Sequence, residues 1–122
     1  MQLMVVYPED KQPFSKADVS RIFQLGDGFM EIRFSPMENV HAECDFQFNN
    51  EISLVWVDSD RLSIGVRGLN DASLKAALNI QVRCDKPLNI VSDSYGIEVS
   101  LSTVSSVEEL LEKLSTEERL NE

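Results

Sequence analysis

The chain has 122 residues, a length that suits one folded domain over residues 1–122. It contains 21 acidic and 11 basic residues, so its formal net charge at pH 7 is −10. Because nucleic acids and anionic membranes both attract basic surfaces, this charge argues against either of them as a partner.

The N-terminal part of the chain predicts one strand and one helix. Residues 2–7 contain the β-branched and aromatic side chains that favour a short strand. A first helix is predicted after Ser15, an N-cap residue with Asp18 at the third helical position, as in a capping box. Gly26 is expected to end this helix. Its predicted buried stripe consists of Val19, Ile22 and Phe23.

The middle of the chain alternates apolar and polar residues over 29–34, 40–48, 52–57 and 62–66. Asn49-Asn50 and Asp58-Ser59-Asp60 mark turns between strands, and connections this short predict a four-stranded antiparallel meander. Gly65, inside a strand, indicates a bulge or a close approach of the backbone. The side chains predicted to face the core are Met30, Ile32, Phe34, Val40, Ala42, Cys44, Phe46, Phe48, Ile52, Leu54, Trp56, Leu62, Ile64 and Val66.

The last third predicts two helices separated by a hairpin. The second helix begins at Asn70 or Asp71, either of which is a good N-cap, and the hairpin spans 88–92 and 97–103. The third helix follows Ser105-Ser106, with Glu108 or Glu109 closing a capping box, and residues 115–122 are expected to fray. The predicted buried positions are Leu74, Ala77, Leu78 and Val82 in the second helix and Val107, Leu110, Leu111 and Leu114 in the third.

The predicted order is therefore β-α-ββββ-α-ββ-α. Strands with one apolar face and helices with one apolar stripe must cover each other. This predicts an α+β fold, a two-layer sandwich with an antiparallel sheet and helices on one face. The opposite face of the sheet is expected to be polar and open, unless a partner covers it.

Few residues suggest catalysis or metal binding. His41, the only histidine, could serve as a general base beside Glu43, but no nucleophile accompanies it, so we favour a solvated histidine. Asp58-Ser59-Asp60 lacks the glycine and the closing glutamate of a calcium loop. We therefore expect no enzyme, no metal and no cofactor.

The compartment follows from the N-terminus and the cysteines. There is no basic leader region, and no segment has the roughly 20 apolar residues that cross a bilayer, which predicts a cytoplasmic protein. In that compartment Cys44 and Cys84 are expected to be small buried hydrophobic residues, and a disulfide between them remains an alternative.

The acidic charge is concentrated in one part of the sequence. Residues 27–60 hold eight acidic residues and one arginine, a net charge of −7, whereas residues 62–104 have no net charge. Solubility is one explanation for this excess, and a negative field that steers a basic protein partner is the other. The residues predicted to bind that partner are Glu31, Glu43, Asp45, Asp58 and Asp60.

The chain resembles bacterial toxin-immunity proteins in its small size, its acidity, its single α+β domain and its acidic strands, such as residues 40–46, VHAECDF. The resemblance implies a non-catalytic protein that inhibits a cognate toxin. A nuclease toxin would suit an acidic inhibitor, because its phosphate-binding site is basic. The resemblance does not identify binding residues, and both a monomer and a homodimer remain open.

A second resemblance is to type III secretion chaperones. From Arg21 to Leu114 the order of elements is similar to theirs, and those proteins are small, acidic dimers that hold an effector in extended form. Two features depart from that pattern: the meander has four predicted strands rather than three, and there is an extra strand at 2–7. The sequence also indicates no exposed apolar patch for an effector.

Overall fold

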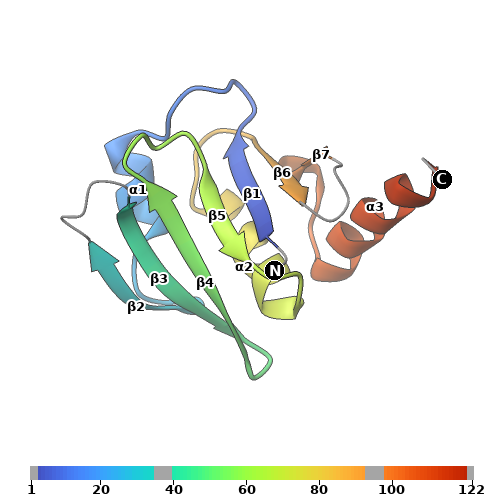
Figure 1. Ribbon diagram of the computed structural model, residues 1–122, viewed down its shortest axis with the longest axis horizontal. Coiled ribbons are helices and arrows are strands. Elements are labelled where there is room, and N and C mark those ends of the chain that lie inside the picture. The colour runs from blue at the N-terminus through green and yellow to red at the C-terminus, as the bar shows by residue number, and fades with distance from the viewer. Residues whose placement is uncertain (1–2, 35–39, 93–97, 121–122) are drawn as a thin grey trace.

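Seven strands form one antiparallel sheet that is accompanied by three α-helices (Figure 1). The computed structural model describes residues 3–34, 40–92 and 98–120, with side chains described for 3–34, 42–92 and 98–114. The fold is α+β, and the predicted order of elements is confirmed. The elements are β1 (Leu3–Pro8), α1 (Lys16–Ile22), β2 (Phe29–Phe34), β3 (Val40–Phe48), β4 (Glu51–Asp58), β5 (Ile64–Arg67), α2 (Asp71–Val82), β6 (Leu88–Ser92), β7 (Glu98–Ser100), a 3₁₀ turn (Leu101–Thr103) and α3 (Val107–Leu120).

The strand order across the sheet is β2-β3-β4-β5-β1-β6-β7. Strands β2 to β5 are neighbours in sequence order, so the predicted meander is confirmed. Strand β1 lies between β5 and β6 and pairs antiparallel with both. The sheet is therefore completed in its interior by the strand closest to the N-terminus.

The core lies between the sheet and the helices α1 and α2, which cover the same side of the sheet (Figure 1). The predicted N-caps are confirmed: Ser15 accepts a hydrogen bond from Asp18 N at 3.0 Å, and Asn70 accepts one from Ser73 N at 2.8 Å. Helix α3 packs against α2 and β7. Predicted core residues that are fully or nearly fully buried include Val19, Ile22, Phe23, Ala42, Cys44, Phe46, Ile64, Val66, Leu74, Ala77, Leu110 and Leu114.

Strand β4 corrects the prediction most strongly, because its two faces are exchanged. Val55 and Val57 are fully buried beneath the helices, and Ser53 is 3% exposed. Ile52, Leu54 and Trp56, which were predicted to point inward, lie on the opposite face. The cause is the two-residue turn at Asn49-Asn50, which pairs Cys44 with Val55 and so places both on the core side.

A bulge in β2 interrupts the predicted alternation there. The pairing with β3 shifts between Met30 and Arg33, and Glu31 adopts a positive φ of 53°. Phe29, predicted to face away from the core, is 2% exposed and packs edge-on against Phe46. Ile32 contacts the core as predicted, whereas Phe34 is 61% exposed.

Several smaller predictions also need correction. Leu111, predicted to be buried, is 39% exposed, and α1 ends at Ile22 with Phe23 as its C-cap rather than at Gly26. Val82 is 82% exposed because Ile80 points into the core, and residues two apart on an α-helix are separated by more than half a turn. Leu62 precedes β5 and is 48% exposed. The predicted strand over 97–103 ends at Ser100, where the 3₁₀ turn begins and buries Leu101. The turn at 93–96 lies outside the described residues, and α3 extends to Leu120.

Candidate docking surface

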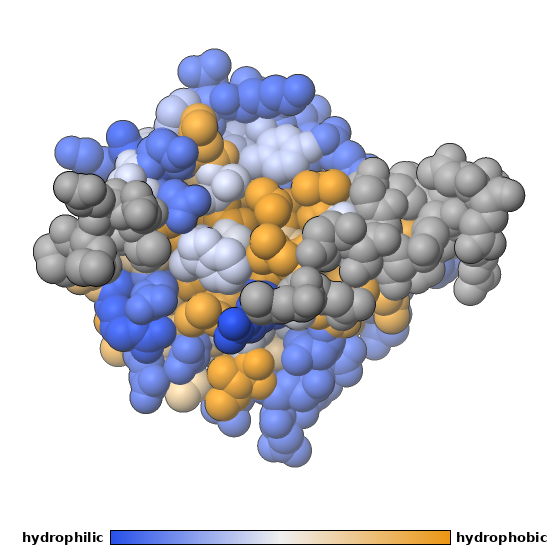
Figure 2. Space-filling model, viewed as in Figure 1, coloured by the Kyte–Doolittle hydropathy of each residue, from blue (hydrophilic) through white to orange (hydrophobic). Residues whose placement is uncertain are grey.

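The face of the sheet turned away from α1 and α2 is the most distinctive surface of the molecule. It was predicted to be polar, and this prediction is wrong: apolar surface gathers over its middle, above β4, β5 and β1 (Figure 2). Helix α3 lies beyond β7 rather than over this face (Figure 1). We call it the open sheet face, and its apolar and aromatic side chains are Leu3, Val5, Tyr7, Ile52, Leu54, Trp56 and Val91.

Trp56 lies at the centre of this surface because Gly65 makes room for it. The two residues pair across β4 and β5. A Cβ atom added to Gly65 would stand 2.3 Å from Cζ2 and 2.4 Å from Cε2 of the indole, closer than real contacts allow. The sequence predicted a bulge or a close backbone approach at Gly65, but the group that approaches is the side chain of Trp56, and the pairing through Gly65 is regular. The indole therefore occupies the space that a side chain at position 65 would fill.

One side of the open sheet face is acidic, and Arg33 organises it. Its Nε lies 3.2 Å from Oε1 of Glu43, and its Nη2 lies 3.6 Å from Oδ1 of Asp45. Its Nη1 lies 3.8 Å from Oε2 of Glu31 and donates a hydrogen bond to the carbonyl of Glu31 at 3.0 Å. The bond to Glu43 raises the pKa of the guanidinium, so Arg33 stays charged. Three carboxylates against one guanidinium leave this cluster with a net charge of −2.

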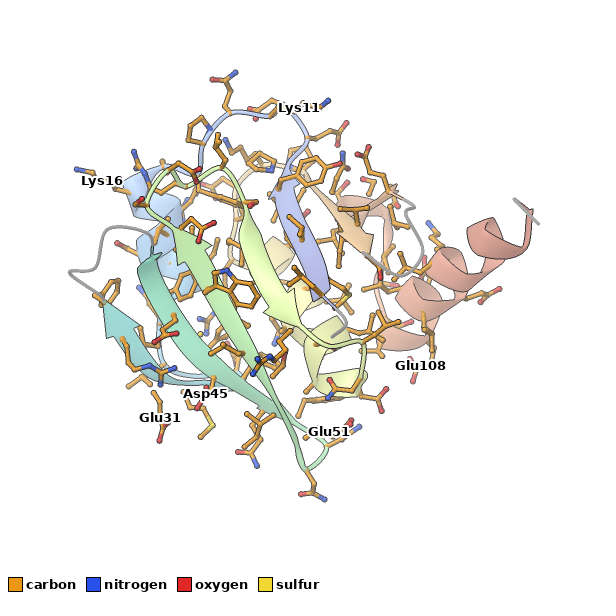
Figure 3. The ribbon with its side chains drawn as sticks, in the orientation of Figure 1. Lys11, Lys16, Glu31, Asp45, Glu51 and Glu108 are labelled. Carbon is orange, nitrogen blue, oxygen red and sulfur yellow. The ribbon has the colours of Figure 1, made fainter. Side chains whose placement is uncertain are left out.

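The five predicted partner-binding residues are thus only partly brought together. Glu31, Glu43 and Asp45 meet around Arg33. Figure 3 shows Glu31 and Asp45 on the β2–β3 side of the sheet. Asp58 ends β4 on the face that carries Trp56, two residues further along the strand. Asp60 is separate from them, because it lies in the β4–β5 turn and accepts a hydrogen bond from Leu62 N at 3.0 Å.

The end of the sheet that carries Asp60 has a mixed charge. A hydrogen bond of 2.7 Å from Phe14 N to Arg61 O attaches the loop between β1 and α1 to the β4–β5 turn. Lys11 lies in that loop and Lys16 begins α1, and both lie at the end of the sheet opposite Glu31, Asp45 and Glu51 (Figure 3). This end of the sheet therefore carries basic side chains beside its acidic ones.

The other candidates from the sequence are one histidine and two cysteines. The side chain of His41 lies outside the described residues. Cys44 and Cys84 are free and buried, and burial raises the pKa of both thiols, to about 12 for Cys44. Among the described residues, no group of three or more histidine, cysteine, aspartate and glutamate side chains has the arrangement of a metal site. Nor does any helix within them have the length and apolar character needed to cross a bilayer.

A pocket of about 400 Å³ lies on the helix side, lined by Asp27, Lys75, Asn79, Val82 and Arg83. Its polar groups already serve the fold. Arg83 donates to the carbonyls of Ile22, Gln24 and Gly26 at 2.7–2.9 Å, and Asn79 donates to the carbonyl of Asp27 at 3.0 Å. We therefore assign these side chains to holding the α1–β2 loop rather than to a ligand.

The apolar half of the docking surface was missed by sequence reasoning, although a signal for it exists. A two-residue turn after Phe48 fixes which residues of β3 and β4 face the same side, and that register points Trp56 away from the core. Comparisons of the chain with family models, with curated proteins and with solved structures found no match.

Proposed function

We propose that the chain is a non-catalytic binding protein that neutralises a basic protein partner on the open sheet face. Within that class, we propose an immunity protein that inhibits a cognate bacterial toxin in the cytoplasm. The observation that carries the proposal is Trp56, a large aromatic residue seated on the sheet surface instead of in the core.

The composition of the open sheet face supports this function. Protein interfaces have an apolar, aromatic centre and a charged rim, and tryptophan is common among the residues that dominate binding energy. Here Trp56, Leu54 and Val5 form the centre, and the cluster around Arg33 forms an acidic rim. A monomeric protein rarely exposes a large apolar patch that nothing covers.

The acidic rim supports a basic partner. The cluster of Glu31, Glu43 and Asp45 keeps a net charge of −2 after Arg33 is counted. Such a rim accelerates encounter with a positively charged surface and repels an acidic one. A nuclease toxin fits this description, because its active site must attract phosphate.

The experiment compares two double charge reversals that change the net charge equally. Glu43→Lys with Asp45→Lys alters the acidic rim, and Glu108→Lys with Glu112→Lys alters exposed positions on α3. The partner to test is the protein encoded beside this chain's gene, and affinity is measured by calorimetry at two salt concentrations. We expect the rim variant to bind at least about 100-fold more weakly and the α3 variant to stay within about threefold.

Circular dichroism on each variant excludes loss of the fold as the cause. A Trp56→Ala variant that retains full affinity, or equal losses from the two charge reversals, would show that the partner binds elsewhere.

A secretion chaperone is the alternative function, and one observation favours it. The sequence indicated no apolar patch for an effector, yet the open sheet face provides one. A chaperone of this kind is a stable dimer that binds an unfolded segment, whereas the proposed inhibitor forms a salt-sensitive 1:1 complex with a folded protein. Sedimentation of the free chain and of its complex distinguishes the two functions.

A further inference from the structure

The indole of Trp56 is pre-organised as a flat platform. Because Gly65 provides the space beneath it, the six-membered ring of the indole rests over Gly65 of β5, and the Trp56 side chain remains partly exposed. Val5 pairs with Gly65 from the far side, so the ring is seated within a row of paired residues. An aromatic side chain held in this way loses little conformational entropy when a partner covers it.

Carboxylates border this platform on two sides. Glu43 pairs directly with Trp56 across β3 and β4. Asp58 follows Trp56 by two residues on the same face of β4. Arg33 contacts Oε1 of Glu43 from the far side of β3. The platform therefore combines an aromatic face with nearby negative charge.

We propose that the partner anchors itself by laying an arginine side chain on Trp56, with its guanidinium stacked on the indole and hydrogen-bonded to Glu43. This inference rests on the proposed function and names the chemistry of its central contact. A planar, weakly hydrated guanidinium can stack on an aromatic ring and bind a carboxylate at the same time, which the compact lysine ammonium cannot do.

Charge complementarity favours a different protein over a second copy of this chain as the occupant. Two copies meeting through this face would bring their acidic clusters together, and each chain carries a formal net charge of −10. A partner with an arginine at the centre of a basic patch meets no such repulsion.

The test uses the intact chain and two short peptides, acetyl-Gly-Arg-Gly-amide and acetyl-Gly-Lys-Gly-amide. Trp56 is the only tryptophan, so its indole N–H gives one assignable signal in a ¹H–¹⁵N spectrum. We expect the arginine peptide to shift this signal saturably and to bind at least about threefold more tightly than the lysine peptide. Glu43→Gln should remove most of that preference, whereas the matched control Glu108→Gln should retain it.

Equal affinity for the two peptides, absence of a saturable shift with either, or an unchanged preference in Glu43→Gln would overturn the inference. A second measurement uses the partner itself, by exchanging each arginine in its basic patch for lysine. One exchange should weaken the complex at least about fivefold, and that loss should disappear in the Trp56→Leu variant.

The two proposals fail in different ways. Suppose that the rim variant and the Trp56→Ala variant no longer bind the partner, but the arginine and lysine peptides bind with equal affinity. The proposed function then stands, and the proposed arginine contact is wrong. If substitutions on the open sheet face leave partner affinity unchanged, the proposed function is wrong, whichever peptide binds more tightly.

Discussion

The guanidinium carbon of Arg83 lies 4.2 Å from the ring centre of Phe29, so the residue that caps α2 stacks on the first residue of β2. The same side chain donates to the carbonyls of Ile22, Gln24 and Gly26. It thereby satisfies three backbone acceptors in the loop that leads from α1 to the sheet.

Arg83→Lys should destabilise the protein although it preserves the charge. A lysine ammonium reproduces neither the planar stack nor the forked set of donors, so we expect the free energy of unfolding to fall by about 2–4 kcal/mol. Urea unfolding followed by circular dichroism measures the change. The control is Arg21→Lys, whose partners Asp18 and Asp85 an ammonium can also pair with. If Arg83→Lys lowers the free energy of unfolding by less than about 1 kcal/mol, the α1–β2 loop does not depend on the contacts of Arg83.

Gly65→Ala should destabilise the fold through Trp56 alone. The backbone at Gly65 has an ordinary φ, so only the clash with the indole opposes a methyl group, and we expect a cost of about 1–3 kcal/mol. In a Trp56→Leu background the same substitution should cost much less. Urea unfolding of both single variants and the double variant gives the coupling energy, and strictly additive costs would contradict the proposed seating of the indole.

The stability of the protein should fall as the pH rises above about 8.5, because of Cys44. Burial raises the pKa of this thiol to about 12, so the folded state keeps the proton while the unfolded state loses it. The unfolded state then binds fewer protons, and a single thiol lowers the free energy of unfolding by up to about 1.4 kcal/mol per pH unit. Cys84 contributes in the same direction.

Urea unfolding between pH 8 and pH 11 checks this prediction against a Cys44→Ala variant. The substitution lowers stability at every pH by creating a cavity, but it should make the decline with pH less steep. Parallel curves for the two proteins would show that Cys44 does not titrate differently in the folded and unfolded states.

Val82 and Ile80 should respond oppositely to substitution. Val82 is 82% exposed at the end of α2, so Val82→Ser should change the free energy of unfolding by no more than about 0.5 kcal/mol. Ile80 is fully buried, and Ile80→Ala should cost about 2–5 kcal/mol. Thermal unfolding of both variants checks the assignment, and a large loss at Val82 would restore the sequence-based prediction of a buried valine.

The order of elements could be predicted from the sequence because caps and turns are local signals. Ser15, Asn70 and the Asn49-Asn50 turn all act where predicted, since each depends on hydrogen bonds or dihedral angles within a few residues. The faces of β4 were harder to assign, because both of them are apolar. Alternation with a period of two then separates the residues into two faces but does not determine which face is buried.

The acidic cluster was only half predictable. Glu43 and Asp45 share a face because residues two apart on a strand always do. Their meeting with Glu31 and Arg33 depends on the bulge in β2, where Glu31 takes a left-handed conformation that glutamate rarely adopts. No local sequence pattern around Glu31 predicts that bulge. The side of the sheet that remains uncovered is likewise set by the packing of whole elements.

The place of β1 determines when the sheet can form during synthesis. Residues 3–8 leave the ribosome before their two neighbours in the sheet, residues 64–67 and 88–92. The meander β2 to β5 can pair locally, but β1 has no partner until β5 emerges and has both only after β6. Until then the edge of β5 that β1 later covers stays exposed to other strands. We therefore expect a chain stalled before residue 88 to aggregate more readily than one that extends beyond β6.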